Sequence, residues 1–344
     1  MKHTLPKSGA SHTLSSLLRI TSIALALGAM NCAANAQYVT IDPPKAVYGS
    51  AATGSTDSSD IVGWFTNVNY VYIGYVDVNG NFTTLVDPSA GTSSGEGTVA
   101  MSMSNGTVAG YYVNGNPASL SSLNGFTYNG TSYTTINDPA GYSTIVSGIS
   151  GANIVGEYRP FGESSPSNGF IYDGNHYITL DDPLGVNGTY LTGISGQIIV
   201  GSYLDSGFVY HGFMFNMATD HWTTLDDPAA PDPTPYRGTN TGGIDGNLID
   251  GAYSNASTAG AFVYNIKTNS WISFRDPSDG DAPGYSTDAT GFAGGMAVGE
   301  YIDKYGVSHG FAVSTPEPST LATAIGFGIT AIFALRKRRS TTPR

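Results

Sequence analysis

Short apolar stretches alternate with small polar residues through the middle of the chain, and three kinds of stretch recur in a fixed order. The first is an apolar pair, then Gly, then usually an aromatic residue two positions later, as in IVGEY at 154–158. The second is Gly followed by an aromatic residue, as in NGFIY at 168–172. The third is a β-branched or aromatic run that ends in Asp-Pro, as in YITLDDP at 177–183. Such alternation, rich in Tyr, Thr, Ile and Val, predicts short β-strands.

These stretches form a repeat. Each kind occurs six times, and successive Asp-Pro aspartates lie 44 to 51 residues apart, at positions 42, 87, 138, 182, 227 and 276. A weaker fourth stretch, such as VSGIS at 146–150, precedes the first kind in several units. A unit of four short strands cannot bury both faces of its sheet alone. The units are therefore predicted to stack on one another, as the blades of a propeller do.

The two ends of the repeat indicate how it closes. A third stretch stands alone at 38–43, and a second stretch stands alone at 309–313, in a last unit that lacks its Asp-Pro strand. A ring supplies the missing strand from the N-terminal side. We therefore predict an all-β fold in which residues 37–315 form a six-bladed β-propeller of four-stranded blades, with the GIS stretch innermost and the Asp-Pro strand outermost. The alternative is an open solenoid or a stack of hairpins, in which the third stretch pairs differently.

The turns of the repeat carry signals of their own. Asn129-Gly130 and Asp173-Gly174 predict two-residue hairpin turns, which require positive φ. The Pro after each Asp ends the outermost strand, because it lacks the N–H that would extend the ladder. The aromatic residue after each second-stretch Gly is expected to pack between blades.

Residues 1–36 have the pattern of a secretory signal peptide. Three basic residues precede the apolar stretch 20–30, and Ala34-Asn35-Ala36 places small residues before a cleavage site. A lipoprotein signal that ends at Cys32 is the alternative. Cys32 is the only cysteine, so cleavage after Ala36 would leave a chain without disulfides.

The segment 316–344 has three parts in order. Pro316-Glu317-Pro318-Ser319 precedes an uninterrupted apolar run, Leu321–Leu335, and four basic residues follow at 336–339. The apolar run predicts a transmembrane helix, although it is shorter than the ~20 residues usual for a bilayer. The basic cluster is expected to remain on the cytoplasmic side. A simple membrane anchor with a basic stop is one interpretation.

In motif, helix and basic end, this tail resembles the PEP-CTERM sorting signal of Gram-negative bacteria. The resemblance implies an exosortase-type sorting machinery as partner, transient anchoring in the inner membrane, and a final location at the cell surface or in exopolysaccharide. The units also resemble HAF-type extracellular repeats, through IVGEY (154–158), YHGFMF (210–215) and SHGFAV (308–313). That likeness implies a secreted repeat protein of unknown activity and transfers no catalytic residues.

Charge narrows the choice of partners. Residues 37–315 contain six basic and 25 acidic side chains, a formal net charge of −19. Such a body repels nucleic acid and anionic membrane surfaces, so no nucleic-acid partner is expected. It also repels strongly anionic polysaccharides unless cations bridge them. Extracellular polysaccharide is therefore a candidate partner, provided that it is not strongly anionic or that cations bridge it to the chain.

A ring of polar residues is the candidate ligand site. Five units place Asp or Ser six positions before the Gly of the first stretch, on the predicted innermost strand. We predict that these side chains face one mouth of the channel: Asp57, Ser104, Ser150, Ser195 and Asp245. The alternative is that they are turn residues that satisfy backbone groups.

The densest acidic loop is the candidate metal site. Asp276, Asp279 and Asp281 offer the clustered carboxylates that calcium prefers, and a solvated loop is the alternative. The Asp-Asp-Pro pairs at 181–183 and 226–228 are weaker calcium candidates, with turn chemistry as the alternative. No other cofactor is expected.

Two histidines and two tryptophans are further candidates. His211 and His309 occupy the same position in two units and could bind zinc or move protons. Structural hydrogen bonding is favoured, because equivalent positions lie far apart around a ring. Trp222 and Trp271 could stack on sugar rings, and are expected instead to fill the core between blades.

These patterns favour a non-enzymatic binding or structural protein of the cell surface or matrix. The sequence has no phosphate-binding loop and no His-Glu-x-x-His motif. The alternative is an extracellular polysaccharide-active hydrolase or lyase on a propeller scaffold. Such an enzyme should break the repeat at one mouth and bring two carboxylates close together.

Overall fold

The structure is a computed structural model of the 344-residue chain, and it describes residues 37–54, 59–116, 122–161, 166–231, 234–280 and 286–314. Residues 38–314 form one compact unit. Over the described ranges the chain forms no α-helix, and so none that is long and apolar enough to cross a membrane. The predicted signal peptide and the predicted sorting tail, with Pro316, Glu317, Pro318 and Ser319, lie outside the described residues.

The described residues form twenty-four strands, which pair antiparallel in six groups of four. Groups one to three contain β2 (Ser50–Ala52), β3 (Ile61–Thr66), β4 (Tyr72–Val78) and β5 (Asn81–Leu85); β6 (Gly97–Ser104), β7 (Thr107–Val113), β8 (Leu123–Tyr128) and β9 (Tyr133–Ile136); and β10 (Gly141–Ser150), β11 (Asn153–Pro160), β12 (Asn168–Tyr172) and β13 (Tyr177–Thr179). Groups four to six contain β14 (Thr189–Ser195), β15 (Ile198–Leu204), β16 (Tyr210–Asn216) and β17 (His221–Leu225); β18 (Gly238–Asp245), β19 (Leu248–Ser254), β20 (Ala259–Asn265) and β21 (Ser270–Phe274); and β22 (Thr287–Ala293), β23 (Met296–Ile302), β24 (Ser308–Ser314) and β1 (Tyr38–Ile41).

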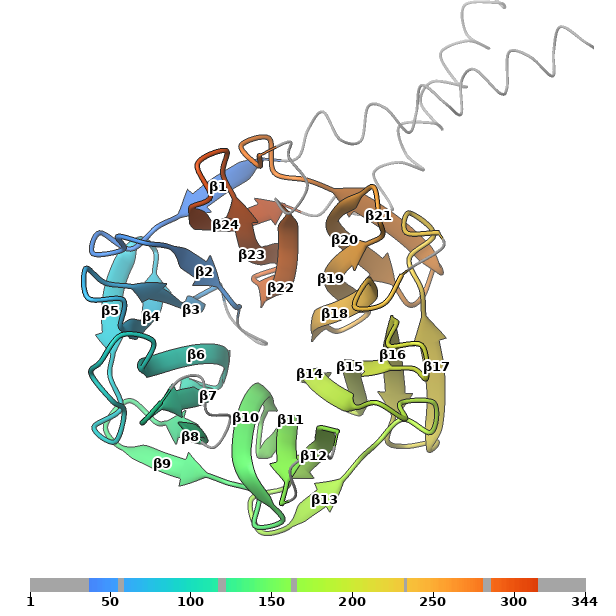
Figure 1. The fold of residues 1–344 in the computed structure, drawn as a ribbon, viewed down its shortest axis with the longest axis horizontal. Helices are drawn as coiled ribbons and strands as arrows, with labels where there is room; N and C mark the ends of the chain where they lie inside the picture. Colours follow the sequence, from blue (N-terminus) through green and yellow to red (C-terminus); the bar gives the residue numbers. More distant parts are fainter. Residues whose placement is uncertain are drawn as a thin grey trace, which may run out of the picture. The chain divides into compact units, whose positions relative to one another are not determined.

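Within a group the strands follow the predicted order. In group three, β10 with its VSGIS stretch pairs with β11, β11 with β12, and β12 with β13. Figure 1 shows β10 nearest the axis of the ring and β13 at its outside. Single parallel pairs, such as Tyr210 with Gly238, join the third strand of one group to the first strand of the next. The groups lie side by side around an axis, which is the arrangement of a β-propeller.

The ring closes where the sequence predicts. Strand β1 pairs with β24 along its whole length, starting with Tyr38 opposite Val313. This pairing confirms that the N-terminal strand completes the last group. Groups six and one are also joined near the axis, where Thr290 Oγ1 donates a hydrogen bond to Ala52 O at 2.7 Å. The open solenoid and the stack of separate hairpins are therefore wrong.

Every group has a Gly on its second strand that faces an aromatic ring on its third. In group four Gly201 lies opposite Phe213, and a Cβ at Gly201 would be 2.3 Å from Tyr190 O on the first strand. Only Gly lets the two strands and the ring approach this closely. The facing rings are fully buried, as predicted for the core between blades: Tyr75, Phe126, Phe170, Phe213, Phe262 and Phe311.

The Asp-Pro turns link each group to the next. Asp182 follows the outermost strand β13, and its N–H donates to Thr189 Oγ1 on β14 at 3.0 Å. Its Oδ1 accepts the N–H of Leu184 at 2.8 Å, which closes an Asx turn. The same two hydrogen bonds recur at Asp87, Asp138, Asp227 and Asp276. The repeated Asp therefore has a structural role in the turn.

The predicted two-residue hairpins are wrong. Four residues, 173–176, connect β12 to β13, and 129–132 connect β8 to β9. Gly174 has a positive φ of 97°, but Asp173 does not. The Asp173 carboxylate accepts the N–H groups of Asn175 and His176 and so stabilises a longer turn.

Candidate functional site

The chain direction gives the ring two different faces. Successive strands of a group are antiparallel, so turns between its first and second strands and between its third and fourth strands share one end. This end includes turns such as 151–152 and 173–176, and we call it the opposite face because it lies opposite the entry face defined next. We call the other end the entry face, because the chain enters each innermost strand there. It includes connections such as 205–209 and 226–237.

The predicted mouth residues that are described lie on the opposite face, at the ends of β6, β10, β14 and β18. Ser104 Oγ accepts the N–H of Gly151 at 3.2 Å, and Ser150 and Ser195 accept the N–H groups of Gly196 and Gly246 at 3.4 Å. Each serine thus bonds to the turn of the next group, as the turn interpretation expects. Burial raises the pKa of Asp245. Asp57 lies outside the described residues.

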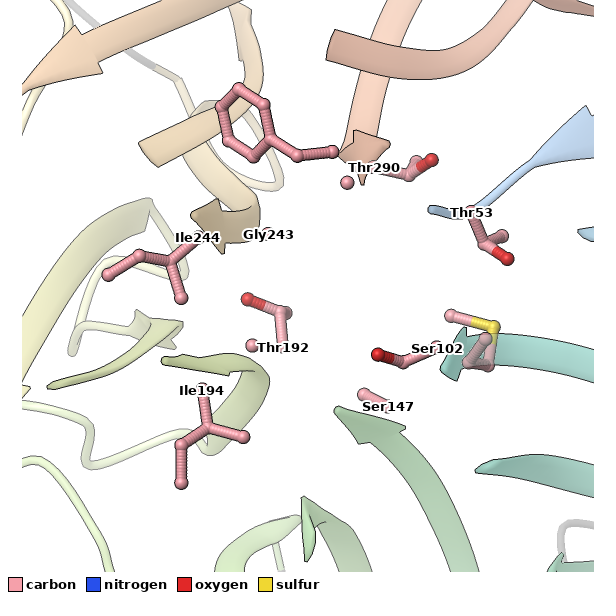
Figure 2. A pocket seen from close by; sticks show the side chains of 12 residues that line it. Thr53, Ser102, Ser147, Thr192, Ile194, Gly243, Ile244 and Thr290 are labelled. Atoms are coloured by element: carbon pink, nitrogen blue, oxygen red, sulfur yellow. The ribbon is translucent and has the colours of Figure 1, made fainter. Parts of the chain in front are cut away.

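A pocket lies on the axis between the innermost strands, and includes about 290 Å³ of empty space, open solvent included. Figure 2 shows hydroxyl side chains around it, from Thr53, Ser102, Ser147, Thr192 and Thr290. The other lining residues are apolar or Gly. The four predicted mouth residues that the structure describes do not line this pocket, and the residues that do line it were not predicted from the sequence.

Bulges place these hydroxyl groups. The pairing of each innermost strand from β6 onward shifts register near the pocket, for example on either side of Ser147 and of Thr192. Several hydroxyls then bond across the boundary between groups: Thr53 Oγ1 donates to Ala100 O at 2.9 Å, and Thr192 and Thr241 Oγ1 are 3.2 Å apart. The Ser or Thr before Gly in the fourth stretch was the signal that could have identified this ring.

One carboxylic acid breaks the repeat beside this pocket. Asp250 on β19 occupies a position that holds Val or Ala in the other groups, and it is fully buried. Gly243 N–H donates to its Oδ1 at 2.5 Å, and no described residue bonds to its Oδ2. Burial raises the pKa of Asp250 to about 7, and the N–H groups of Gly243 and Gly291 oppose this rise. Both glycines line the pocket. The Asp in IDGAY, where other units have Val or Ala, was the signal for this departure.

A pair of acids lies closer to the entry face. Asp288 on β22 and Glu300 on β23 are cross-strand neighbours. Burial and the Glu300 charge raise the pKa of Asp288 to about 6, and burial raises that of Glu300. Ser308 Oγ lies 2.5 Å from Glu300 Oε2 and 2.9 Å from Ser50 O. Ser308 is the donor in both contacts, and its hydrogen bond to Glu300 opposes the rise in the Glu300 pKa.

The acidic loop has its own partners. Asp276 Oδ1 accepts the N–H of Ser278, and Asp279 Oδ2 lies 3.1 Å from Arg275 Nε and 2.8 Å from Thr287 Oγ1. Asp281 lies outside the described residues. Within the described part of the chain, no three His, Cys, Asp or Glu side chains are grouped as metal ligands would be. Calcium binding at this loop stays a prediction.

The histidines are hydrogen bonded within the fold. His211 Nδ1 lies 2.9 Å from Asp226 Oδ1, and His309 Nδ1 lies 2.8 Å from Asp42 Oδ2. Each imidazole also stacks on a Tyr ring of the neighbouring strand. The prediction of structural hydrogen bonding is confirmed. Asp226 of one Asp-Asp-Pro pair is therefore engaged with a histidine.

The tryptophans pack against the core rings of their own groups. Trp222 and Phe213 form an edge-on pair with centroids 5.0 Å apart, and Trp271 and Phe262 do the same at 4.9 Å. Both tryptophans are half-buried and pack against the core, as expected. The segment GTSSG at 91–95 matches a Gly-x-Ser-x-Gly pattern, but it lies in an entry-face connection between strands, with no helix after it. It is not a nucleophile elbow.

No family model and no curated protein matches this chain. Among solved structures, TolB from Acinetobacter baumannii is 12% identical over 74% of this chain, with a TM-score of 0.49, and this chain spans 64% of its length. The SapL1 lectin, solved in complex with alpha methyl fucoside, is 14% identical over 78% of this chain and 94% of its own, with a TM-score of 0.50. At this identity the likeness to the lectin shows the fold alone, an all-β propeller.

Proposed function

We propose that this chain is an exported protein of the cell surface or exopolysaccharide matrix. Its six-bladed propeller of HAF-type repeats would bind or organise polysaccharide without catalysing a reaction. The PEP-CTERM-like tail at 316–344 and the signal-peptide pattern at 1–36 support export and sorting by an exosortase-type machinery. The net charge of −19 over residues 37–315 favours neutral glycans, or anionic glycans bridged by cations.

One observation favours binding over catalysis. The pocket on the axis is lined, among the residues that the structure describes, by hydroxyl, apolar and Gly residues and by no acid, base or nucleophilic cysteine. Hydrolysis of a glycosidic bond needs two carboxyl groups that flank the substrate. A pocket with this lining offers contacts to a ligand, and Asp250 beside it is fully buried and does not line it.

A polysaccharide panel tests this proposal. The full-length chain, purified in mild detergent, is incubated with neutral and anionic polysaccharides with and without calcium. Retention on at least one polysaccharide, without release of reducing ends or unsaturated products, is the expected result. Turnover that is lost in an acid-to-amide variant would overturn the non-enzymatic proposal. No retention on any member would overturn the binding proposal.

A polysaccharide-active enzyme is the second candidate, favoured by the Asp288–Glu300 pair. These acids have raised pKa values and one of them contacts a hydroxyl, as a general acid and its partner would. If this candidate is correct, Glu300→Gln abolishes turnover on the panel while retention persists. Unchanged products in Glu300→Gln would remove this pair from consideration.

A further inference from the structure

The exposed aromatic side chains of the described residues all lie on the entry face. Six aromatic residues are at least 41% exposed, and each belongs to a connection on that face: Tyr48, Tyr70, Phe161, Phe208, Tyr236 and Tyr305. Other aromatic residues in the described ranges are buried or half-buried. A segregation this complete does not follow from the repeat, because the aromatic residues of the repeat are its core.

Four of these residues form two pairs. The rings of Tyr48 and Tyr70 stack with centroids 3.9 Å apart and planes 9° apart. Phe208 and Tyr236 have centroids 5.6 Å apart and planes 35° apart, and Tyr236 N–H donates to Phe208 O at 2.7 Å. Each pair joins two different entry-face connections. The rings are therefore fixed in place and still exposed.

The backbone at three of these positions is one that Gly adopts more easily. Tyr70, Phe208 and Tyr236 have φ values of 59°, 60° and 62°, in the left-handed region. A bulky side chain there is strained in a way that Gly is not. The fold does not require an aromatic residue at these positions.

Equivalent turns of the same chain use Gly instead. The turns 67–71, 205–209 and 303–307 each begin with an Asn or Asp that accepts two backbone N–H groups. Their fourth residue is Tyr70, Phe208 and Gly306, respectively. The hydrogen-bond partners of these residues show the same exchange. Tyr70 O accepts the N–H of Gly95, and Phe208 O accepts the N–H of Tyr236. Gly95 and Tyr236 therefore occupy equivalent positions. Aromatic residues thus replace Gly against local preference, which indicates selection for something outside the turn.

Exposed, rigid rings with hydroxyl groups suit the apolar face of a pyranose ring. The C–H groups of that face pack on the negative face of an aromatic ring, and the phenol and nearby carboxylates can bond to sugar hydroxyls. The pairs lie on separate groups of the ring, which suits successive units of an extended chain. The carboxylate of Asp205, in the turn that contains Phe208, disfavours an anionic glycan.

We propose that the Tyr48–Tyr70 and Phe208–Tyr236 pairs on the entry face are stacking platforms for a neutral polysaccharide. This inference rests on the proposed function and adds the location of the site and the charge class of its ligand. It moves the ligand site from the opposite face, where the sequence placed it, to the entry face.

The local Gly precedents supply variants that keep the fold. In the full-length chain, Tyr70→Gly, Phe208→Gly and Tyr236→Gly are combined, and retention on cellulose, curdlan and mannan is compared with retention on alginate. The triple variant should melt at or above the wild-type temperature, because it relieves three left-handed aromatic residues. It should bind neutral polysaccharides at least tenfold more weakly. Ile178→Ser, which changes an exposed apolar residue on outer strand β13, is the matched control and should bind as wild type.

The outcomes separate this inference from the proposed function. Wild type that binds a neutral polysaccharide, with equal binding by the triple variant, would leave the proposed function standing and overturn the platform. Wild type that binds no member would overturn the proposed function itself. Binding to alginate alone, or self-association of wild type that the triple variant loses, would show a different occupant and also overturn the platform.

Discussion

The two faces of the ring differ in how closely they follow the repeat. On the opposite face, Ser104, Ser150 and Ser195 make the same hydrogen bond to the next group. On the entry face the repeated Asp-Pro turns lie beside residues that occur only once or twice, such as Tyr70, Phe208 and the Asp288–Glu300 pair. Positions that repeat hold neighbouring groups together. Positions that depart from the repeat are where this chain can recognise something particular.

The largest expected effect concerns the framework that both faces share. Gly201→Ala places a methyl group 2.3 Å from Tyr190 O and against the Phe213 ring. The first and second strands of group four must then separate, and the free energy of unfolding should fall by more than ~3 kcal/mol. Chemical denaturation followed by circular dichroism measures this change.

A second glycine provides the control. Gly174 also lacks a side chain, has φ of 97° and has no atom within 4 Å of its would-be Cβ. Gly174→Ala should therefore cost only about 1 kcal/mol, from backbone conformation alone. Equal costs for the two substitutions would contradict the close packing at Gly201.

Asp250, the departure next to the axial pocket, should make stability depend on pH. Its pKa is about 7 in the folded chain and lies near 4 in an unfolded chain. Between these values the unfolded state ionises while the folded state remains protonated. The contribution of Asp250 to the free energy of unfolding is therefore fully present below about pH 4. It is lost as the pH rises toward 7, and the loss is roughly 4 kcal/mol at most.

Asp250→Asn removes this titration and retains an oxygen for the Gly243 N–H. The variant should be more stable than wild type by about 1–3 kcal/mol at pH 8 and no more stable at pH 4. Unfolding curves at both pH values measure the difference. If the difference in stability between the variant and wild type did not change with pH, Asp250 would not have a raised pKa in the folded chain.

The smallest effect is expected on the opposite face. Ser150→Ala removes the acceptor of the Gly196 N–H, but this hydrogen bond is exposed and water replaces it. The cost should be below about 1 kcal/mol, and polysaccharide retention should not change. A loss of retention in Ser150→Ala, with stability intact, would place the ligand site on the opposite face, as the sequence pattern predicted.

The fold could be predicted from the sequence because the recurring stretches and their order indicate both the strands and the closure of the ring. Isolated stretches at 38–43 and 309–313 required a closing strand, and the aromatic residue after each second-stretch Gly was expected in the core, where it is fully buried. The candidate site could not be predicted in the same way. Tyr70 and Phe208 lie in turns whose pattern looks like any polar loop, and their exposure depends on which end of the ring each turn occupies. Asp250 was visible as an exception, but its burial depends on the neighbouring group.

The antiparallel pairing of β1 with β24, which closes the ring, determines how the ring responds to force. Tyr38, the first residue of β1, pairs with Val313 near the end of β24, so the start of β1 and the end of β24 lie at the same end of the pair. A pulling force between these two strand ends loads the hydrogen bonds one after another, as in a zipper, rather than all together in shear. The propeller should therefore be mechanically weakest at the point where it is closed, and tension would open it there before any other blade yields.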